Sequence, residues 1–359
     1  TDPWIIDSDS FTVDYENKLG SGAFCAVFKG RVIGEPPVCR QNPSIMGVKK
    51  FKDCECAVKV LPEFADSTAR YNFMQEISFM KTLQYHLHLV SMIGWNNDSD
   101  SPMLLVEYCK QGDLQHLLRS KKDEIIQVNS FTLFDNFWQV SNGMEYLSSI
   151  GCIHRDIAAR NVLIDENNVA KVSDFGLCRI PDEDLYNGKG GRLPLKWMAP
   201  ESLISYTYSE KSDVWSYGVL LYEIFSFGSV PYTTEAMTSA ELQEFLKSGK
   251  RLQRTPYCPE EMYLMQLCWK FEQEERPTFV EVSSTLTKIL ESSSQNYGYV
   301  DAVNEYDESV RRPNCVPNDE NNDYYLFIGK LFTNVLNDCN KLKRFSAFVR
   351  IIESVSIIM

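Results

Sequence analysis

The stretch CIHRDIAARNVLIDENNVAKVSDFGLCR, residues 152–179, constrains the chain more than any other part of its sequence. Asp156, Asn161 and Asp174 occur in it in that order, separated by short strand-like pieces. A carboxylate that can accept a hydroxyl proton, followed by an amide and a second carboxylate that can ligate a hard cation, suits metal-assisted phosphoryl transfer. Each of these residues alone could cap a loop, but the ordered set predicts a phosphoryl-transfer site.

A lysine inside an apolar strand pattern adds a second chemical group. Lys59 lies in the middle of the run CAVKV, and a buried ammonium group needs a partner because leaving it unpaired is costly. Residues 67–84 predict a helix that begins at Asp66 or Ser67, with Glu76 beside its apolar face and able to supply that partner. Taken alone, the lysine fits equally well at a strand edge with its amine in water.

The glycine-containing run LGSGAFCAVFKG, residues 19–30, reads G-x-G-x-x-C. Gly20 and Gly22 lack Cβ atoms, so backbone N–H groups there can approach a phosphate closely, although a plain hairpin turn fits the same pattern. The run continues as a strand and opens no helix, which disfavours a dinucleotide-binding loop of the Rossmann type. Cys25 should reduce the flexibility of the loop without blocking it, and it places a thiol at its edge that is open to oxidation.

The apolar pattern predicts an α+β protein in which a small strand-rich part precedes a larger helical part. The two parts join near residues 107–112, and the cleft between them is a favoured place for a ligand. The Pro- and Gly-rich connection 34–53 is interpreted as a long loop insertion. The strands are expected within residues 11–19, 26–33, 54–61, 101–109, 162–166 and 170–174.

Composition limits the class of protein. The net charge of −13 over 359 residues argues against binding along a nucleic-acid backbone, so we expect no nucleic-acid partner. Eleven cysteines at irregular spacing indicate free thiols in a reducing compartment. No apolar stretch reaches 18 residues, and the acidic start lacks the apolar core of a signal peptide. Because the chain lacks an initiating Met, we interpret it as a processed protein or a piece of a longer one.

These motifs together resemble those of the eukaryotic protein kinases over residues 11–292. The resemblance rests on Gly20-x-Gly22, the AVK run that ends at Lys59, Glu76, HRDIAARN, DFG at 174–176 and APE at 199–201. Ala158 and Arg160 in the catalytic loop HRDIAARN are similar to the tyrosine kinase group. RLPLKWMAPES resembles the substrate-positioning segment of that group, in which Pro194 and Trp197 would shape a ledge for the substrate far enough from Asp156 for a phenol. The opening WIIDSDSFTV and the run VEYCKQGDL resemble the branch of fibroblast and platelet-derived growth factor receptors.

The resemblance implies the bilobal kinase fold, a small N-lobe with one key helix and a larger, mostly helical C-lobe. It implies an N-terminal juxtamembrane-like segment, 1–10, and a kinase domain, 11–292, with a hinge near 107–112 between an N-lobe, 11–108, and a C-lobe, 113–292. Beyond the resemblance, the polar and acidic composition predicts a tyrosine-rich, disordered tail, 293–330. Apolar residues at 3- or 4-residue steps predict an amphipathic end, 331–359.

The resemblance also implies roles for individual residues. Asp156 would be the catalytic base, oriented by Arg160; Lys59, held by Glu76, would contact the α- and β-phosphates; and Asn161 and Asp174 would hold Mg²⁺, for which Mn²⁺ is an alternative. The ATP-binding residues would be Leu19, Gly20, Gly22, Val27, Ala57, Lys59, Glu107, Cys109 and Leu163, with Val106 as gatekeeper.

Further structural and regulatory roles follow from the same resemblance. Met80, Met92, His154 and Phe175 should stack as an internal spine, and Glu201 should form a buried ion pair with Arg276. Tyr186 is expected to be a regulatory phosphorylation site whose phosphate pairs with Arg155 and Arg179. The alternative is an unmodified surface tyrosine in a mobile loop.

The expected function is ATP-dependent phosphorylation of tyrosine in protein substrates by the intracellular part of a receptor-like kinase. This places the chain on the cytoplasmic side of the plasma membrane, or in the cytoplasm if no receptor surrounds it. The expected partners are adaptor proteins at tail phosphotyrosines and a second copy through a parent receptor. A pseudokinase scaffold is the alternative, and a small-molecule phosphotransferase is disfavoured by the APE and RLPLKWMAPE segments.

Overall fold

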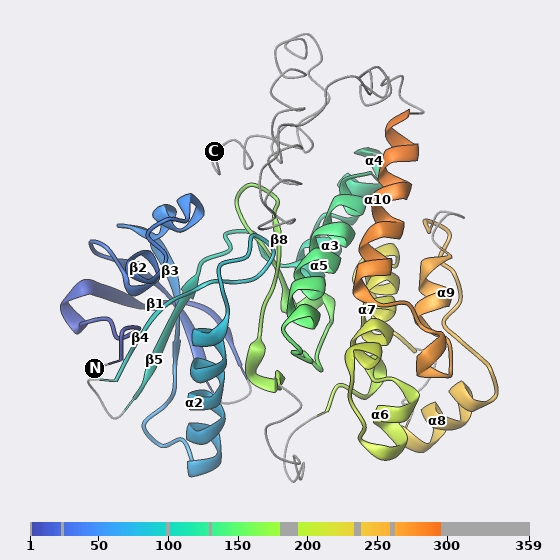
Figure 1. The fold of residues 1–359 in the computed structure, drawn as a ribbon, viewed down its shortest axis with the longest axis horizontal. Coiled ribbons are helices and arrows are strands. Elements are labelled where there is room, and N and C mark those ends of the chain that lie inside the picture. The colour runs from blue at the N-terminus through green and yellow to red at the C-terminus, as the bar shows by residue number, and fades with distance from the viewer. Residues whose placement is uncertain are drawn as a thin grey trace, which may run out of the picture. The chain divides into compact units, whose positions relative to one another are not determined.

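The computed structural model describes residues 2–22, 25–97, 101–128, 131–179, 193–232, 238–258 and 263–295. Two compact units are distinguished, Thr1–Thr285 and Leu286–Met359. The described part of the second unit is the last part of helix α10 (Phe279–Gln295). Figure 1 draws the chain as a ribbon, and the sheets and the candidate site lie in the first unit.

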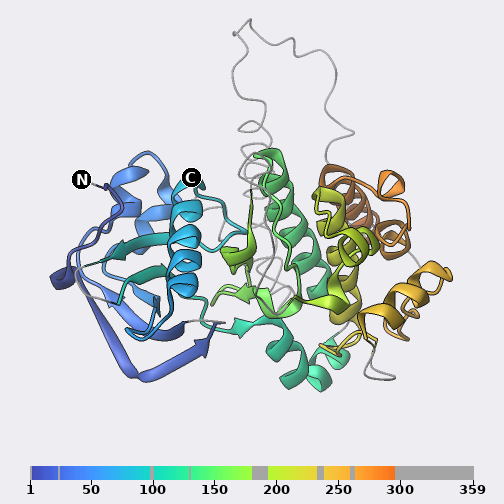
Figure 2. The same cartoon turned by 90° about the horizontal axis from the view of Figure 1, so that it is seen from below.

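The N-terminal part is built on a five-stranded antiparallel sheet of order β1-β2-β3-β5-β4. Helix α2 (Ser67–Thr82) lies beside this sheet in both Figure 1 and Figure 2. As predicted, the side chain of Asp66 caps α2 by accepting a hydrogen bond from the backbone N–H of Ala69. The strands are β1 (Phe11–Ser21), β2 (Ala26–Val32), β3 (Glu55–Val60), β4 (Met92–Asn96) and β5 (Met103–Glu107).

The connection between β2 and β3 departs from the prediction of a plain loop. It contains helix α1 (Pro37–Gln41) and the 3-10 helix η2 (Met46–Phe51). Pro37 occupies the first position of α1, where its missing N–H costs nothing, so the Pro-rich sequence begins a helix here. The insertion contributes four buried side chains to the core of the N-terminal part, Val38, Cys39, Val48 and Phe51.

The segment before β1 is attached to the same sheet. The 3-10 helix η1 (Ser8–Ser10) leads into β1, and Ile5 forms a parallel bridge with Trp95 of β4. The carboxylate of Asp2 accepts a hydrogen bond from the Trp95 indole at 2.9 Å and pairs with Lys81 near the end of α2. These contacts connect the first residues to the C-terminal end of α2.

The C-terminal part is mostly helical and also carries a small sheet of order β6-β7-β8. Its helices α5 (Phe131–Ser149) and α7 (Glu210–Phe225) lie side by side and contact each other (Figure 1 and Figure 2). The strands of this small sheet are β6 (Gly112–Asp113), β7 (Val162–Ile164) and β8 (Ala170–Val172). Strand β6 follows the junction near residues 107–112, and its pairing with β7, which pairs in turn with β8, brings residues 152–179 back toward that junction. The predicted α+β architecture of two parts is therefore confirmed.

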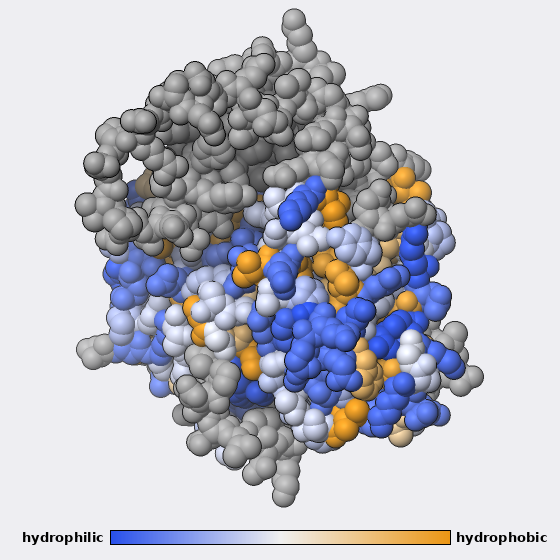
Figure 3. Space-filling view, turned by 45° about the vertical axis from the view of Figure 1, so that its right-hand side comes forward, coloured by the Kyte–Doolittle hydropathy of each residue, from blue (hydrophilic) through white to orange (hydrophobic). Residues whose placement is uncertain are grey.

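The remaining elements of this part are α3 (Leu114–Ser120), α4 (Lys122–Val128), α5 (Phe131–Ser149), η3 (Ala159–Asn161), η4 (Phe175–Leu177), η5 (Leu195–Trp197), α6 (Pro200–Ser205), α7 (Glu210–Phe225), α8 (Ser239–Lys247), α9 (Leu264–Cys268) and η6 (Gln273–Glu275). Helix α7 is buried along almost its whole length, which explains why apolar residues occur on every side of it. On the face in Figure 3, the described surface is mostly hydrophilic with hydrophobic residues in small groups, as is usual for a globular domain.

Candidate active site

The predicted ion pair between β3 and α2 is present. Lys59 and Glu76 lie with Nζ and Oε1 2.5 Å apart, and Glu76 is on the buried face of α2. Burial alone would lower the pKa of Lys59, but the carboxylates of Glu76 and Asp174 raise it above its usual value, so the amine stays charged. A charged ammonium group thus lies near the carboxylate of Asp174, where it could also pair with the negative charge of a phosphate.

The carboxylate of Asp156 is held by its neighbours in the catalytic loop. Arg160 forms an ion pair with Asp156 Oδ1. Asn161 donates from Nδ2 to the backbone oxygen of Asp156 at 2.7 Å and to Asp156 Oδ2 at 2.8 Å. Since the amide nitrogen of Asn161 is turned toward Asp156, its amide oxygen remains available as a metal ligand.

Two non-glycine residues of the site have left-handed backbone conformations. Arg155 has φ 71° and Asp174 has φ 64°, and such residues persist only where the surroundings enforce them. The carboxylate of Asp213 accepts hydrogen bonds from the backbone N–H groups of His154 at 2.7 Å and Arg155 at 2.9 Å. Asp213 therefore holds the strained turn that precedes Asp156.

Asp213 and Glu223, both on α7, are site residues that the sequence analysis missed. The carboxylate of Glu223 accepts hydrogen bonds from the backbone N–H of Ala159 and from the indole of Trp197, both at 2.9 Å. It joins the catalytic loop to the RLPLKWMAPES segment. Both carboxylates are buried. The sequence signal for them is an acid within or directly before the apolar run VWSYGVLLYEIF, although the sequence does not say what that acid binds.

Trp197 also contacts the catalytic loop directly. The guanidinium carbon of Arg160 lies 4.4 Å from the centre of the Trp197 ring, a cation–π contact. Arg160 thus touches Asp156 on one side and the predicted substrate ledge on the other. The geometry couples the position of this ledge to that of Asp156.

The residues predicted to bind the nucleotide lie on strands around the junction. Gly20 pairs with Val27 in the β1–β2 ladder, Val27 with Lys59, and Ala57 with Val106. Glu107 ends β5, Cys109 follows it, and Leu163 lies on β7. Leu19 is more than a third exposed, while Val106 and Cys109 are buried. Their contacts with adenine stay a prediction.

The predicted spine residues Met80, Met92, His154 and Phe175 are all buried. The rings of His154 and Phe175 lie 5.8 Å apart, and Met80 and Met92 line one cavity. The ring of Phe175 also contacts the ring of Phe79 on α2, and the two ring centres are 5.8 Å apart. Helix α2 therefore packs against the residue that follows Asp174.

The guanidinium groups expected to meet a regulatory phosphate lie in the described part of the chain, whereas Tyr186 lies outside it. Arg155 stacks on Tyr208 at 4.7 Å, and its buried Nε atom has no hydrogen-bond partner among the residues that the structure describes. Burial, followed by the nearby Arg179, lowers the pKa of Arg155. An anion beside these two arginines could accept a hydrogen bond from Arg155 Nε, and its negative charge would reduce the repulsion between the two guanidinium groups.

The predicted pair of Glu201 and Arg276 is present as a double hydrogen bond of 2.6 and 2.8 Å. Arg276 is fully buried, as expected for a structural role. Among the described residues, no group of three or more His, Cys, Asp and Glu side chains could hold a metal ion. Because Mg²⁺ usually keeps phosphate and water oxygens among its ligands, two protein ligands such as Asn161 and Asp174 would be enough for a site. No helix in the described ranges is long and apolar enough to cross a membrane.

Comparison with known proteins gives consistent matches. The family profile described as protein tyrosine and serine/threonine kinase matches residues 13–286. The chain is 43% identical to the candidate tyrosine-protein kinase F09A5.2 of Caenorhabditis elegans over 316 residues, covering 83% of this chain and 36% of that protein. It is 36% identical to the tyrosine kinase receptor Cad96Ca of Drosophila melanogaster over 292 residues, covering 78% and 36%.

Identity to fibroblast growth factor receptor 1 of Xenopus laevis is 37% over 306 residues, covering 80% of this chain and 36% of that receptor. The chain thus spans about a third of the length of these relatives.

Proposed function

Because the chain belongs to the protein tyrosine kinase family, with receptor tyrosine kinases among its relatives, we propose that it transfers the γ-phosphate of ATP to tyrosine in protein substrates. The observation that carries the proposal is the Asp156 carboxylate, held on both oxygens by Arg160 and Asn161. A general base must be fixed within reach of the proton that it accepts. Asp156 would accept the proton of the substrate hydroxyl from this position.

A bound Mg²⁺ or Mn²⁺ ion would neutralise the charge of the phosphates. Asn161 Oδ1 and the carboxylate of Asp174 would hold it, because both are the hard oxygen ligands that such ions prefer. The left-handed backbone of Asp174 is a strain that this binding role would explain.

On the nucleotide side, Lys59 would bind the α- and β-phosphates in the orientation set by Glu76. Backbone N–H groups near Gly20 and Gly22 would cover the phosphates. Leu19, Val27, Ala57 and Leu163 would enclose adenine, and backbone groups of Glu107 and Cys109 would hydrogen-bond it.

Preference for tyrosine over serine would come from the segment around Trp197. Its ring stacks on Arg160 and its indole is anchored on Glu223, which supports a fixed ledge at a set distance from Asp156. A phenol is longer than a serine side chain, so such a ledge would favour the residue that reaches the base from further away.

We propose that phosphorylation of Tyr186 switches the enzyme. Within the described ranges the buried Nε of Arg155 has no partner, and Arg179 lies near enough to lower the pKa of Arg155. Both observations support this proposal, because a phosphate carries nearly two charges and strong hydrogen-bond acceptors. Ordering of the segment around Tyr186 by these arginines would place the substrate ledge for catalysis.

The relatives also support a receptor context. We propose that the chain is the intracellular part of a receptor kinase at the plasma membrane, that it pairs through its parent receptor, and that phosphotyrosines of the tail bind adaptor proteins. Tail residues Tyr297, Tyr299, Tyr306, Tyr324 and Tyr325 lie outside the described residues. Finding an apolar span of about 20 residues upstream of Thr1 in the parent gene would test this context.

The catalytic proposal is tested with the Asp156→Asn variant, ATP, Mg²⁺ and matched tyrosine and serine peptides. We expect the wild-type chain to phosphorylate the tyrosine peptide, and the variant to lose at least about 10²-fold in rate, the contribution of a positioned base. Asp14→Asn, at an exposed position of β1, is the control and should keep full activity. Transfer only to serine would refute the tyrosine assignment. No transfer even after Tyr186 is phosphorylated would favour a scaffold.

A further inference from the structure

Glu107, the last residue of β5, carries a buried carboxylate that joins several segments of the chain. Its Oε1 atom lies 2.5 Å from Lys50 Nζ and 3.2 Å from Lys171 Nζ. Its Oε2 atom accepts a hydrogen bond from the backbone N–H of Ser91 at 3.3 Å, and its own N–H donates to the Ser91 oxygen at 2.9 Å. Glu107 is therefore fixed through both its side chain and its backbone.

The two lysines reach Glu107 from different parts of the molecule. Lys171 is fully buried on β8, three residues before Asp174, and also donates to the backbone oxygen of Leu87 at 2.6 Å. Lys50 comes from η2 in the insertion, and 40% of its side chain is exposed. Burial would raise the pKa of Glu107, but Lys171 and Lys50 outweigh it and lower that pKa, so the carboxylate stays ionised.

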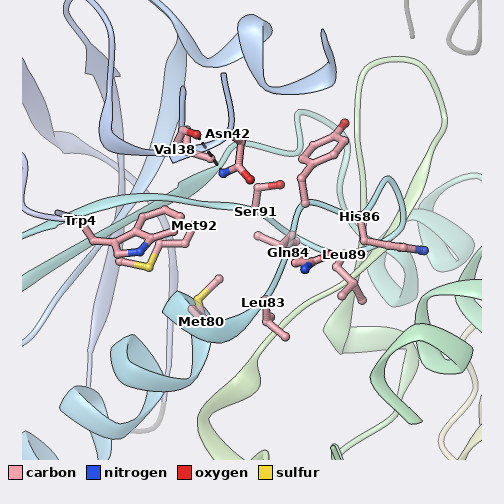
Figure 4. Close-up of a pocket in the computed structure, with 12 residues that line it drawn as sticks. Trp4, Val38, Asn42, Met80, Leu83, Gln84, His86, Leu89, Ser91 and Met92 are labelled. Carbon is pink, nitrogen blue, oxygen red and sulfur yellow. Dashed lines mark hydrogen bonds between the residues drawn. The ribbon is translucent and has the colours of Figure 1, made fainter. Parts of the chain in front are cut away.

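The insertion that carries Lys50 is itself firmly packed. Besides its share of the core, it fits closely against the loop after α2: a Cβ atom on Gly47 would lie 2.7 Å from the Tyr85 ring, so only glycine permits this contact. Val38 and Asn42 of the insertion also line a cavity of about 20 Å³ opposite Met80 of α2 (Figure 4). Lys50 therefore projects from an element that is packed into the core of the N-terminal part.

The position of Glu107 matters because the hinge begins at this residue. Lys50 fixes it against the insertion and Lys171 fixes it against the strand that leads to Asp174. Backbone groups that are already in place before a ligand arrives bind it more tightly, since less ordering has to occur on binding.

We propose that Lys50 is a positioning residue for the nucleotide, and that the insertion 34–53 braces the hinge through the contact between Lys50 and Glu107. This inference rests on the proposed function, because it assumes that hinge backbone groups recognise adenine. It assigns a role in nucleotide affinity to a segment that lies outside the nucleotide site.

The test compares Lys50→Met with wild type by calorimetric titration with Mg-ADP and by steady-state kinetics. We expect the Kd for ADP and the KM for ATP to rise about two- to fivefold, the range for a partly exposed ion pair, while kcat changes less than about twofold. Lys50→Arg should restore wild-type values. Lys49→Met, at an exposed neighbour on η2, is the matched control and should change neither constant.

A double-mutant cycle with Glu107→Gln separates this role from a general loss of stability. If Lys50 acts through Glu107, Lys50→Met should not weaken ADP binding further in the Glu107→Gln background. An unchanged Kd in Lys50→Met, or an equal loss in both backgrounds, overturns the proposal. A wild-type chain that binds ADP without transferring phosphate would refute only the proposed function, whereas one that binds no ADP would overturn both.

Discussion

The Lys59→Met substitution removes the ammonium group that the structure places against Glu76 and keeps a side chain of similar length. Nζ and Oε1 are 2.5 Å apart, and the two side chains are 18% and 9% exposed. Methionine preserves the apolar stem within β3, so the packing of the strand should change little. The perturbation is therefore mainly the loss of one charge beside a nearly buried carboxylate.

The expected cost in stability lies between two limits. Removing one partner of a fully buried ion pair costs about 3–5 kcal/mol, while an exposed pair contributes about 0–1 kcal/mol. Lys59 is partly exposed, so we expect a loss of about 2 kcal/mol in the free energy of unfolding. Domains have about 5–15 kcal/mol of stability, so the variant should stay folded, with its Tm lowered by about 4–8 °C.

The expected cost in activity is larger. Removing a single preorganised donor from a site where charge develops lowers the rate by about 10²–10³-fold, and Lys59 also holds Glu76 in place. The measurement is phosphate transfer to a tyrosine peptide, with thermal unfolding recorded on the same samples. Lys59→Met should therefore separate the two properties, losing activity and keeping the fold.

A matched control lies on the neighbouring strand. Lys29 on β2 pairs with Glu55 at 2.6 Å, but these side chains are 27% and 45% exposed. Lys29→Met should change the free energy of unfolding much less than Lys59→Met does, because the pair is exposed to solvent, and it should leave transfer unchanged. Our reasoning is refuted if Lys59→Met keeps more than a tenth of wild-type activity, or if it unfolds and thereby behaves as a structural residue.

Two further predictions concern stability. Arg276→Met should lower the free energy of unfolding by about 3–5 kcal/mol in a denaturant titration, because a buried guanidinium with five hydrogen bonds is lost and Glu201 is left unpaired. Adding Glu201→Gln should recover part of that loss, and a double variant worse than the single one would contradict this account. Burial lowers the pKa of His86 to about 4. As the pH falls, the unfolded chain therefore binds a proton on this residue before the folded chain does. The free energy of unfolding should consequently fall between about pH 6.5 and pH 4. Between pH 7 and 5, wild type should lose about 2 kcal/mol relative to His86→Gln, and parallel pH curves for the two proteins would exclude this.

Much of the candidate site was predictable because its signals are local or depend on a known order of motifs. Asp66 caps α2 as its sequence position indicates, and Lys59 meets Glu76 because an apolar strand and an amphipathic helix each leave one charged group facing inward. The pair of Glu201 and Arg276 followed from the resemblance to kinases.

The insertion was not predictable in the same way. Its prolines and glycines were interpreted as a loop, yet Pro37 begins α1 and Gly47 permits the contact with Tyr85. Whether a proline begins a helix or ends one depends on the residues that follow and on what they pack against. Lys50 could not be connected with Glu107, because the pairing depends on how the insertion folds over the sheet.

Asp213 and Glu223 were missed for a related reason. Periodicity identifies α7 as a helix but does not say which backbone N–H groups its two buried carboxylates meet. Those donors belong to residues 154, 155 and 159, and lie about 60 positions earlier in the chain. Only the tertiary fold turns these acids into supports of the catalytic loop.

The glycine-containing run has Cys25 where the pattern G-x-G-x-x-G has its third glycine. The contacts between Gly22 and Cys25 show how this cysteine is accommodated. The N–H of Gly22 donates to the backbone oxygen of Cys25 at 2.8 Å, and a Cβ atom on residue 22 would lie 2.8 Å from Cys25 Sγ. The cysteine side chain therefore occupies the space that Gly22 leaves, so the change at position 25 makes glycine at position 22 more necessary. Burial raises the pKa of the Cys25 thiol, which makes it less reactive than a thiol at an open lip would be. Gly22 and Cys25 should consequently be treated as one packed unit, and a variant of either is informative only beside a variant of the other.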